Sequence, residues 1–97
     1  MDEKRQFFRI HNNGSIHASC DGHPLEVIEI SSSGVAIIKE DTHIQNKGKI
    51  DLQIEESHLK INYEVLRVEE KTMVLVFKKK SDVEKLFLIL KRLKDKH

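Results

Sequence analysis

Two arginines near the start of the chain, Arg5 and Arg9, have a spacing that suits the binding of an anion. Residues four positions apart share a face on a helix and also on a strand, so the two side chains point the same way in either conformation. A guanidinium group binds phosphate, or the O6 and N7 edge of guanine, through two parallel hydrogen bonds. The pair is therefore a candidate clamp for such a ligand, and the alternative is a solvated charged tail.

A short polar stretch, residues 29–34, interrupts two apolar runs and offers groups that suit the same kind of ligand. The Glu29 carboxylate can accept hydrogen bonds from the amide edge of guanine, and the Ser31 hydroxyl can donate to phosphate or to a base. Gly34 permits a positive φ or a close approach of a ligand to the backbone. The plain alternative is an exposed turn between strands, since serine and glycine are common in turns.

Three further residues are weaker candidates for this site. Lys4 directly precedes the arginine pair and could contact phosphate, although a solvated lysine explains it equally well. Arg67 lies on a late strand, where an exposed surface charge is the favoured interpretation. Ser33 either adds a hydroxyl to the site or only shapes the turn.

Metal binding and catalysis find little support in the sequence. His11, His17 and His23 are six residues apart, which is not the short ligand spacing of zinc motifs. Cys20 is the one cysteine, so the chain cannot form an internal disulfide. No nucleophile, base and orienting partner can be assembled from the motifs. We therefore predict no metal site, no cofactor and no catalytic residues.

Composition limits the class of protein further. The 97 residues suit one domain, and a net charge of +1 argues against a general nucleic-acid binder, which needs a large basic excess. The sequence has no apolar signal segment and no stretch as long as a membrane helix. We expect a cytoplasmic protein that does not insert into a membrane.

Apolar periodicity predicts about six short strands before a helix. The predicted strands are residues 15–20, 25–30, 34–39, 49–55, 58–68 and 73–77. Asp21–Gly22 is a strong hairpin signal. The apolar phase slips at Val27–Ile28, which indicates a bulge or a strand buried on both faces, and it slips again after Val65. Residues 73–77 are apolar on both faces, which is typical of a strand covered on both sides.

The end of the chain has the three-and-four apolar spacing of one helical face. It predicts a helix over 81–96, begun by a capping box of Ser81 and Glu84. The chain thus divides into a flexible N-terminal clamp segment (1–13), a barrel (14–80) and the helix (81–96), all in one domain.

Together the motifs "RQFFR" and "EISSSG" resemble the PilZ domain family, whose pattern is RxxxR followed by (Asp/Asn)xSxxG. The flanking strands and the final helix agree, so the resemblance covers nearly the whole chain. It implies a six-stranded antiparallel β-barrel with a C-terminal helix that binds cyclic di-GMP, a bacterial second messenger. It also implies that Arg5 and Arg9 clamp the ligand, that Glu29 contacts a guanine edge, and that Ser31 and Gly34 form the facing surface.

Glu29 departs from the family pattern, which has Asp or Asn there. Glutamate keeps the acceptor but adds a methylene, so we expect binding at reduced affinity. The resemblance implies a receptor or adaptor whose ligand is cyclic di-GMP and whose output is contact with an unidentified downstream protein, and a homodimer is left open. We expect the N-terminal segment, residues 1–13, to become ordered over the ligand.

Two alternatives remain at this point. A degenerate PilZ-like barrel would act only as a protein-interaction module without binding nucleotide, and Glu29 is its best support. A small RNA- or DNA-binding barrel is favoured by Lys78–Lys80 and the lysine-rich helix. That second alternative lacks exposed aromatic residues for base stacking and a large net charge.

Overall fold

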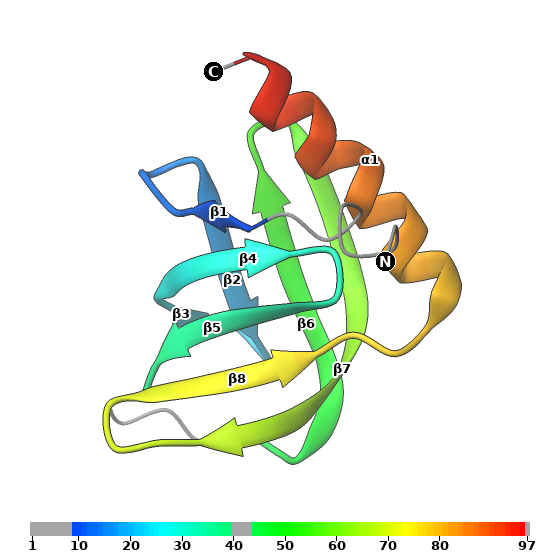
Figure 1. Cartoon of the computed structure of the whole chain (residues 1–97). Coiled ribbons are helices and arrows are strands. Elements are labelled where there is room, and N and C mark those ends of the chain that lie inside the picture. The colour runs from blue at the N-terminus through cyan, green and yellow to red at the C-terminus, as the bar shows by residue number, and fades with distance from the viewer. Residues whose placement is uncertain (1–8, 40–43, 97) are drawn as a thin grey trace, which may run out of the picture.

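The computed structural model describes residues 9–39 and 44–96, with side chains as far as Asp95. The predictions for Lys4 and Arg5 lie outside the described residues. Within this part of the chain, eight strands precede one C-terminal helix (Figure 1). The elements are β1 (Ile10–His11), β2 (Ile16–Cys20), β3 (His23–Leu25), β4 (Val27–Ser31), β5 (Gly34–Ile38), β6 (Lys47–Ile54), β7 (Ser57–Val68), β8 (Thr72–Val76) and α1 (Lys80–Lys96).

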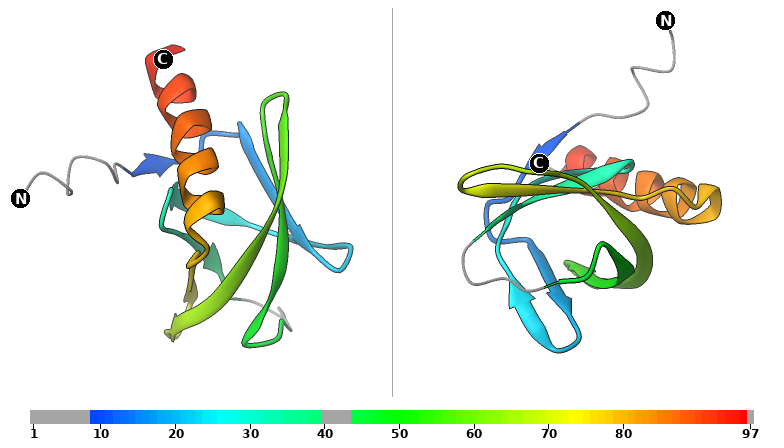
Figure 2. Two further views of the ribbon diagram at one scale, coloured as in Figure 1. Left: turned by 90° about the vertical axis from the view of Figure 1, so that its right-hand side faces the viewer. Right: turned by 90° about the horizontal axis from the view of Figure 1, so that it is seen from below.

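The eight strands form one antiparallel sheet in the order β1-β4-β5-β8-β7-β6-β2-β3. The sheet curls around a common interior, as Figure 2 shows from below. Asn12 links β2 and β4, each of which lies next to an edge strand at opposite ends of the sheet. Its side-chain amide donates to the carbonyl of Ile16 on β2 (3.0 Å) and to that of Val27 on β4 (3.1 Å). The predicted class, an antiparallel barrel-like sheet with a C-terminal helix, is confirmed, with eight strands in place of six.

The first additional strand, β1, pairs with β4 and places His11 opposite Glu29. A two-residue strand shows no alternation that a periodicity analysis could detect. Part of the segment 1–13, which we expected to be a flexible clamp, is therefore a strand of the sheet.

The second additional strand, β3, ends at Leu25, and Glu26 separates it from β4. The sequence predicted one strand over residues 25–30 instead. Asp21 and Gly22 form the turn that precedes β3, with φ values of 53° and 83°. Positive φ at both central residues is the geometry of a type I′ hairpin turn, so the turn predicted at Asp21–Gly22 is confirmed.

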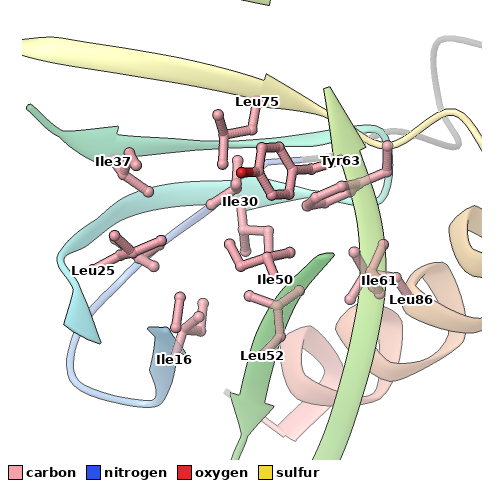
Figure 3. Packing of buried hydrophobic residues seen from close by; sticks show 14 of the residues in the cluster. Ile16, Leu25, Ile30, Ile37, Ile50, Leu52, Ile61, Tyr63, Leu75 and Leu86 are labelled. Atoms are coloured by element: carbon pink, nitrogen blue, oxygen red, sulfur yellow. The ribbon is translucent and has the colours of Figure 1, made fainter. Parts of the chain in front are cut away.

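One hydrophobic core fills the space between the curled sheet and α1, and Figure 3 shows its side chains meeting there. The helix packs against β4 and β7 and turns Leu86, Leu90 and Leu93 inward, as their spacing predicts. Burial of each such leucine contributes roughly 1.5–3 kcal/mol, so the core holds the helix in place. The fully buried apolar side chains are Ile30, Ile37, Ile50, Leu52, Ile54, Ile61, Leu75, Leu86 and Leu90.

The helix begins at Lys80, one residue before the predicted start. The backbone N–H of Val83 donates to the Lys79 carbonyl at 3.0 Å, which closes the first helical turn at Lys79. Ser81 consequently lies inside that turn and not in front of it. The predicted capping box of Ser81 and Glu84 is wrong, because the helix already begins at the preceding lysines, Lys79 and Lys80.

Candidate functional site

A bulge in β4 determines which side chains of this strand face outward. The pairing of β4 with β5 shifts between Val27 and Glu29, so Ile28 is an additional residue. Without it, simple alternation from the buried Val27 would turn Glu29 inward and Ile30 outward. With it, Ile30 is buried in the core while Glu29 and Ser31 lie on the outer face. The bulge that the phase slip indicated is confirmed, and it aims two candidate residues outward.

A second bulge has the same effect on β7. Its pairing with β8 shifts between Val65 and Arg67, which makes Leu66 the additional residue. Val65 packs against the core, and Arg67 lies on the outer face opposite the half-buried Val74. Leu66 is 60% exposed, so the bulge also presents an apolar side chain to solvent.

The serine stretch forms a two-residue hairpin turn, since Ser31 pairs with Gly34. The Ser31 hydroxyl oxygen accepts a hydrogen bond from the Ser33 backbone N–H at 3.2 Å and lies 3.0 Å from the Ser33 hydroxyl. Ser32 points the other way and is buried, and its hydroxyl has no hydrogen-bond partner within the described part of the chain. The turn thus presents two hydroxyls, Ser31 and Ser33, on the outer face.

Gly34 is required by the sheet itself. A Cβ atom at this position would lie 2.5 Å from the Leu75 carbonyl oxygen on β8, which is too close for any side chain. The absence of a side chain therefore has a structural cause that does not involve a ligand. The predicted role of Gly34 in letting a ligand approach the backbone stays a prediction.

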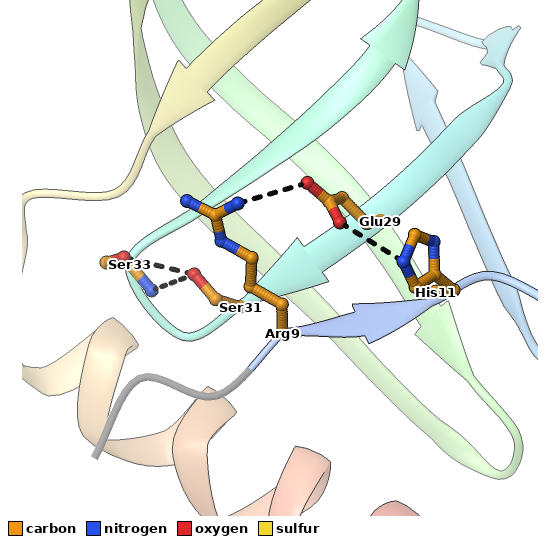
Figure 4. A network of polar contacts seen from close by, with 5 residues as sticks. All are labelled: Arg9, His11, Glu29, Ser31 and Ser33. Carbon is orange, nitrogen blue, oxygen red and sulfur yellow. Dashed lines mark hydrogen bonds and ion pairs between the residues drawn. The ribbon is translucent and has the colours of Figure 1, made fainter. Parts of the chain in front are cut away.

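Glu29 lies between the side chains of Arg9 and His11 from the N-terminal segment (Figure 4). Its carboxylate oxygens lie 3.6 Å from Arg9 Nη1 and 3.8 Å from His11 Nε2. These distances are longer than direct hydrogen bonds, and the Arg9 and His11 side chains are 75% and 84% exposed. The Arg9 contact is therefore a weak ion pair, and both contacts are open to exchange for a ligand. The sequence analysis did not assign His11 to this site. The one feature that could have indicated it is that His11 lies two residues after Arg9, and on an extended segment such residues share a face.

Arg9 and Glu29 line a cavity of about 340 Å³ on the outer face of the sheet, and His11 is not part of its lining. That volume falls at the small end of the roughly 300–1,000 Å³ typical of ligand pockets. Its polar lining is Arg9, Glu29, Ser31, Ser33 and Arg67. Its other lining residues include Gly34, Ala36, Leu66, Val74 and Val76.

Arg67 lines this cavity as an exposed side chain, so the exposed surface charge that the sequence favoured lies at the rim of the site. Its Nε lies 3.2 Å from a Glu69 carboxylate oxygen, and its side chain is 60% exposed. Arg67 and Arg9 thus border a surface that combines two guanidinium groups, hydroxyls and an apolar floor. Such a surface can bind a phosphate at its rim and the flat face of a base on its floor.

Within residues 9–39 and 44–96, no three histidine, cysteine, aspartate or glutamate side chains are grouped as metal ligands. No helix among them is long and apolar enough to cross a membrane.

The fold and this cavity together define a small antiparallel barrel with a ligand-sized site on its wall. The model of the PilZ-like family (PilZ domain-like) matches residues 9–97, and the chain belongs to that family. The resemblance inferred from the motifs is confirmed.

The chain is similar to several solved structures, among them the following two. An uncharacterized Legionella protein, Lpg0364, shares 44% sequence identity with a TM-score of 0.89, and the match covers 92% of this chain and 96% of that one. The Bacillus subtilis Inhibitor of motility (MotI/DgrA) shares the fold at 19% identity and a TM-score of 0.63. That match covers 97% of this chain but 53% of the Bacillus protein. The search of curated proteins finds no match.

Proposed function

We propose that the chain is a receptor for cyclic di-GMP that acts by contacting a protein partner and catalyses no reaction. The observation that carries the proposal is the convergence of the motif residues. Arg9 comes from the N-terminal segment, and Glu29, Ser31 and Gly34 come from the β4–β5 hairpin, yet all four line the same cavity. Arg67 extends this cavity with a second guanidinium group.

The cavity offers a partner to each part of a cyclic dinucleotide. Arg9 would bind a phosphate or the O6 and N7 edge of a guanine, and Glu29 would accept from its N1–H and N2–H₂ groups. Ser31 keeps hydrogen-bonding capacity beyond the contacts with Ser33, so its hydroxyl can reach a phosphate. The apolar floor suits the face of a base. In this proposal Arg5 completes the clamp.

Ligand binding would have to replace the contact between Arg9 and Glu29. This contact is weak because Arg9 is 75% exposed, so the exchange is feasible. The same contact is the best support for the rival function, a PilZ-like barrel that contacts proteins but binds no nucleotide. In the rival, Glu29 would keep Arg9 permanently engaged.

Isothermal titration calorimetry with cyclic di-GMP, GTP and a short RNA tests the proposal. We expect binding of cyclic di-GMP alone, with affinity reduced about tenfold to hundredfold in Arg9→Ala, because a bidentate contact contributes roughly 1–3 kcal/mol. Arg92→Ala is the matched control, since Arg92 is exposed on α1 and does not line the cavity. No heat with cyclic di-GMP would favour the interaction-only rival. An equal loss in both variants would indicate nonspecific attraction to charge.

A further inference from the structure

Within the described residues, the first part of β6 is a free strand edge. β6 runs from Lys47 to Ile54, but β2 pairs only with its second half, from Asp51 to Ile54. Lys47, Gly48 and Lys49 pair with β7 on one side. On the other side, no strand of the described chain pairs with them. Their outer edge can therefore accept another strand.

The hydrogen bonding of β6 shows which backbone groups face this edge. In antiparallel pairs, hydrogen-bonded and non-hydrogen-bonded positions alternate. Asn46 is in a hydrogen-bonded position, because its carbonyl accepts from the Val65 N–H at 2.8 Å. Gly48, opposite Tyr63, is the next such position. Lys47 and Lys49 consequently direct their N–H and C=O groups away from β7, toward the free edge.

These backbone groups have few partners of their own. The Lys49 carbonyl is contacted by the Cys20 thiol at 3.5 Å, and a thiol is a weak donor. Unpaired N–H and C=O groups along a strand are a template for a further strand. A short extended peptide could therefore add one hydrogen-bonded rung at Lys47 and another at Lys49.

The charge along the edge is mainly positive. Lys47 and Lys49 are exposed, and no carboxylate of the described residues lies within ion-pair distance of either. Both line a cavity of about 490 Å³ beside the edge, together with Lys60, Asp21 and Asp51. Lys60 lies 3.9 Å from Asp51, so that pair is largely neutral. Asp21 offsets one of the two remaining lysines, so the edge keeps a net positive charge.

We propose that this edge binds an acidic, extended segment of a partner protein by strand addition. Main-chain hydrogen bonds would supply affinity, and Lys47 and Lys49 would select acidic side chains. The same lysines oppose pairing with a second copy of the chain, because like charges would face each other. A nucleic acid suits the edge less well, since its continuous phosphates need many cationic contacts and the edge offers two lysines.

The edge is separate from the cavity assigned to the nucleotide, because the two cavities share no lining residue. The inference therefore stands or fails independently of cyclic di-GMP binding. Its partner chemistry is an alternation of acidic and β-forming residues, which presents carboxylates on one face of an extended strand.

A fluorescein-labelled peptide of alternating glutamate and valine tests the inference by fluorescence anisotropy with the full chain. We expect binding that weakens about tenfold or more in the double variant Lys47→Glu, Lys49→Glu. The control Lys85→Glu, Lys91→Glu changes net charge equally on the exposed face of α1 and should leave affinity within about twofold. No binding by the wild type, or equal loss in both double variants, would overturn the proposal.

Amide hydrogen exchange followed by NMR separates strand addition from simple charge attraction, without any variant. Bound peptide should slow exchange at the Lys47 and Lys49 amides, which face the free edge. The Gly48 amide faces β7 and should change little. Binding without protection at Lys47 and Lys49 would contradict strand addition, and tighter binding of a short RNA than of the peptide would contradict an acidic protein partner.

Discussion

Glu29→Gln should strengthen the binding of cyclic di-GMP. In the ligand-free chain the Glu29 carboxylate lies 3.6 Å from Arg9 Nη1 and holds the arginine that the ligand needs. Glutamine removes this attraction but keeps a carbonyl oxygen that can accept from the guanine amide edge. A neutral acceptor also fits the family pattern, in which Asn and Asp are both found at this position.

The expected gain is small because the ion pair is exposed. At 3.6 Å two unit charges in water attract each other by about 1 kcal/mol. Measured exposed pairs contribute roughly 0.2–1 kcal/mol, and the Arg9 side chain is 75% exposed. Released in full, this energy corresponds to an affinity increase of up to about fivefold. Removing a negative charge beside an anionic ligand acts in the same direction.

Calorimetry at about 0.15 M ionic strength, where long-range attraction is screened, measures this difference. Glu26→Gln is the matched control, because Glu26 is exposed next to β4 and lines no part of the cavity. It removes the same charge and should leave affinity unchanged. A tenfold or greater weakening in Glu29→Gln would refute the reasoning, since it would mean that the carboxylate charge itself contacts the guanine.

Two further predictions concern stability and pH. Gly34→Ala should lower the free energy of unfolding by about 1–3 kcal/mol in urea titrations, because its Cβ would meet the Leu75 carbonyl oxygen at 2.5 Å, whereas the exposed Ser33→Ala should change it by less than about 0.5 kcal/mol. An unchanged Gly34→Ala would show that β5 and β8 can separate freely. Burial, with the neighbouring Cys20 thiol, raises the pKa of Tyr63 from 10.0 to about 12. Between these values the unfolded chain loses the phenolic proton and the folded chain keeps it, so stability should fall by up to about 2–3 kcal/mol as pH rises from 10 to 12. Tyr63 is the one tyrosine in a chain without tryptophan, so absorbance follows its titration directly, and a midpoint near 10 would contradict the effect of burial.

The outward placement of Glu29 could be predicted from the sequence because the core requires it. Val27 and Ile30 are both buried, and two buried residues three apart cannot alternate regularly on one strand. A bulge at Ile28 allows both residues to be buried, and in the sequence it is visible as the phase slip between Val27 and Ile28. Local apolar pattern thus carried information about the site, because the site residues occupy the positions that the core leaves outside.

The surroundings of Glu29 could not be predicted in the same way. His11 lies opposite Glu29 because β1 pairs with β4. A strand of two residues is too short to show apolar alternation in the sequence. Likewise, the sequence suggested that Gly34 lets a ligand approach, but the atom that excludes a side chain there is the Leu75 carbonyl oxygen on β8. Such contacts depend on which strands become neighbours, and that is set by the whole sheet.

The apolar floor of the cavity implies that the proposed binding need not depend on the arginines alone. Residues 73–77 are apolar on both faces, and such a strand is typically covered on both sides. The core covers the inner face of β8, while Val74 and Val76 line the cavity on its outer face. A base resting there would remove apolar surface from water, at roughly 25 cal/mol for each Å². Because this contribution survives the loss of a guanidinium group, Arg9→Ala should weaken binding and not abolish it, and neutralising Glu29 should shift affinity by a small factor.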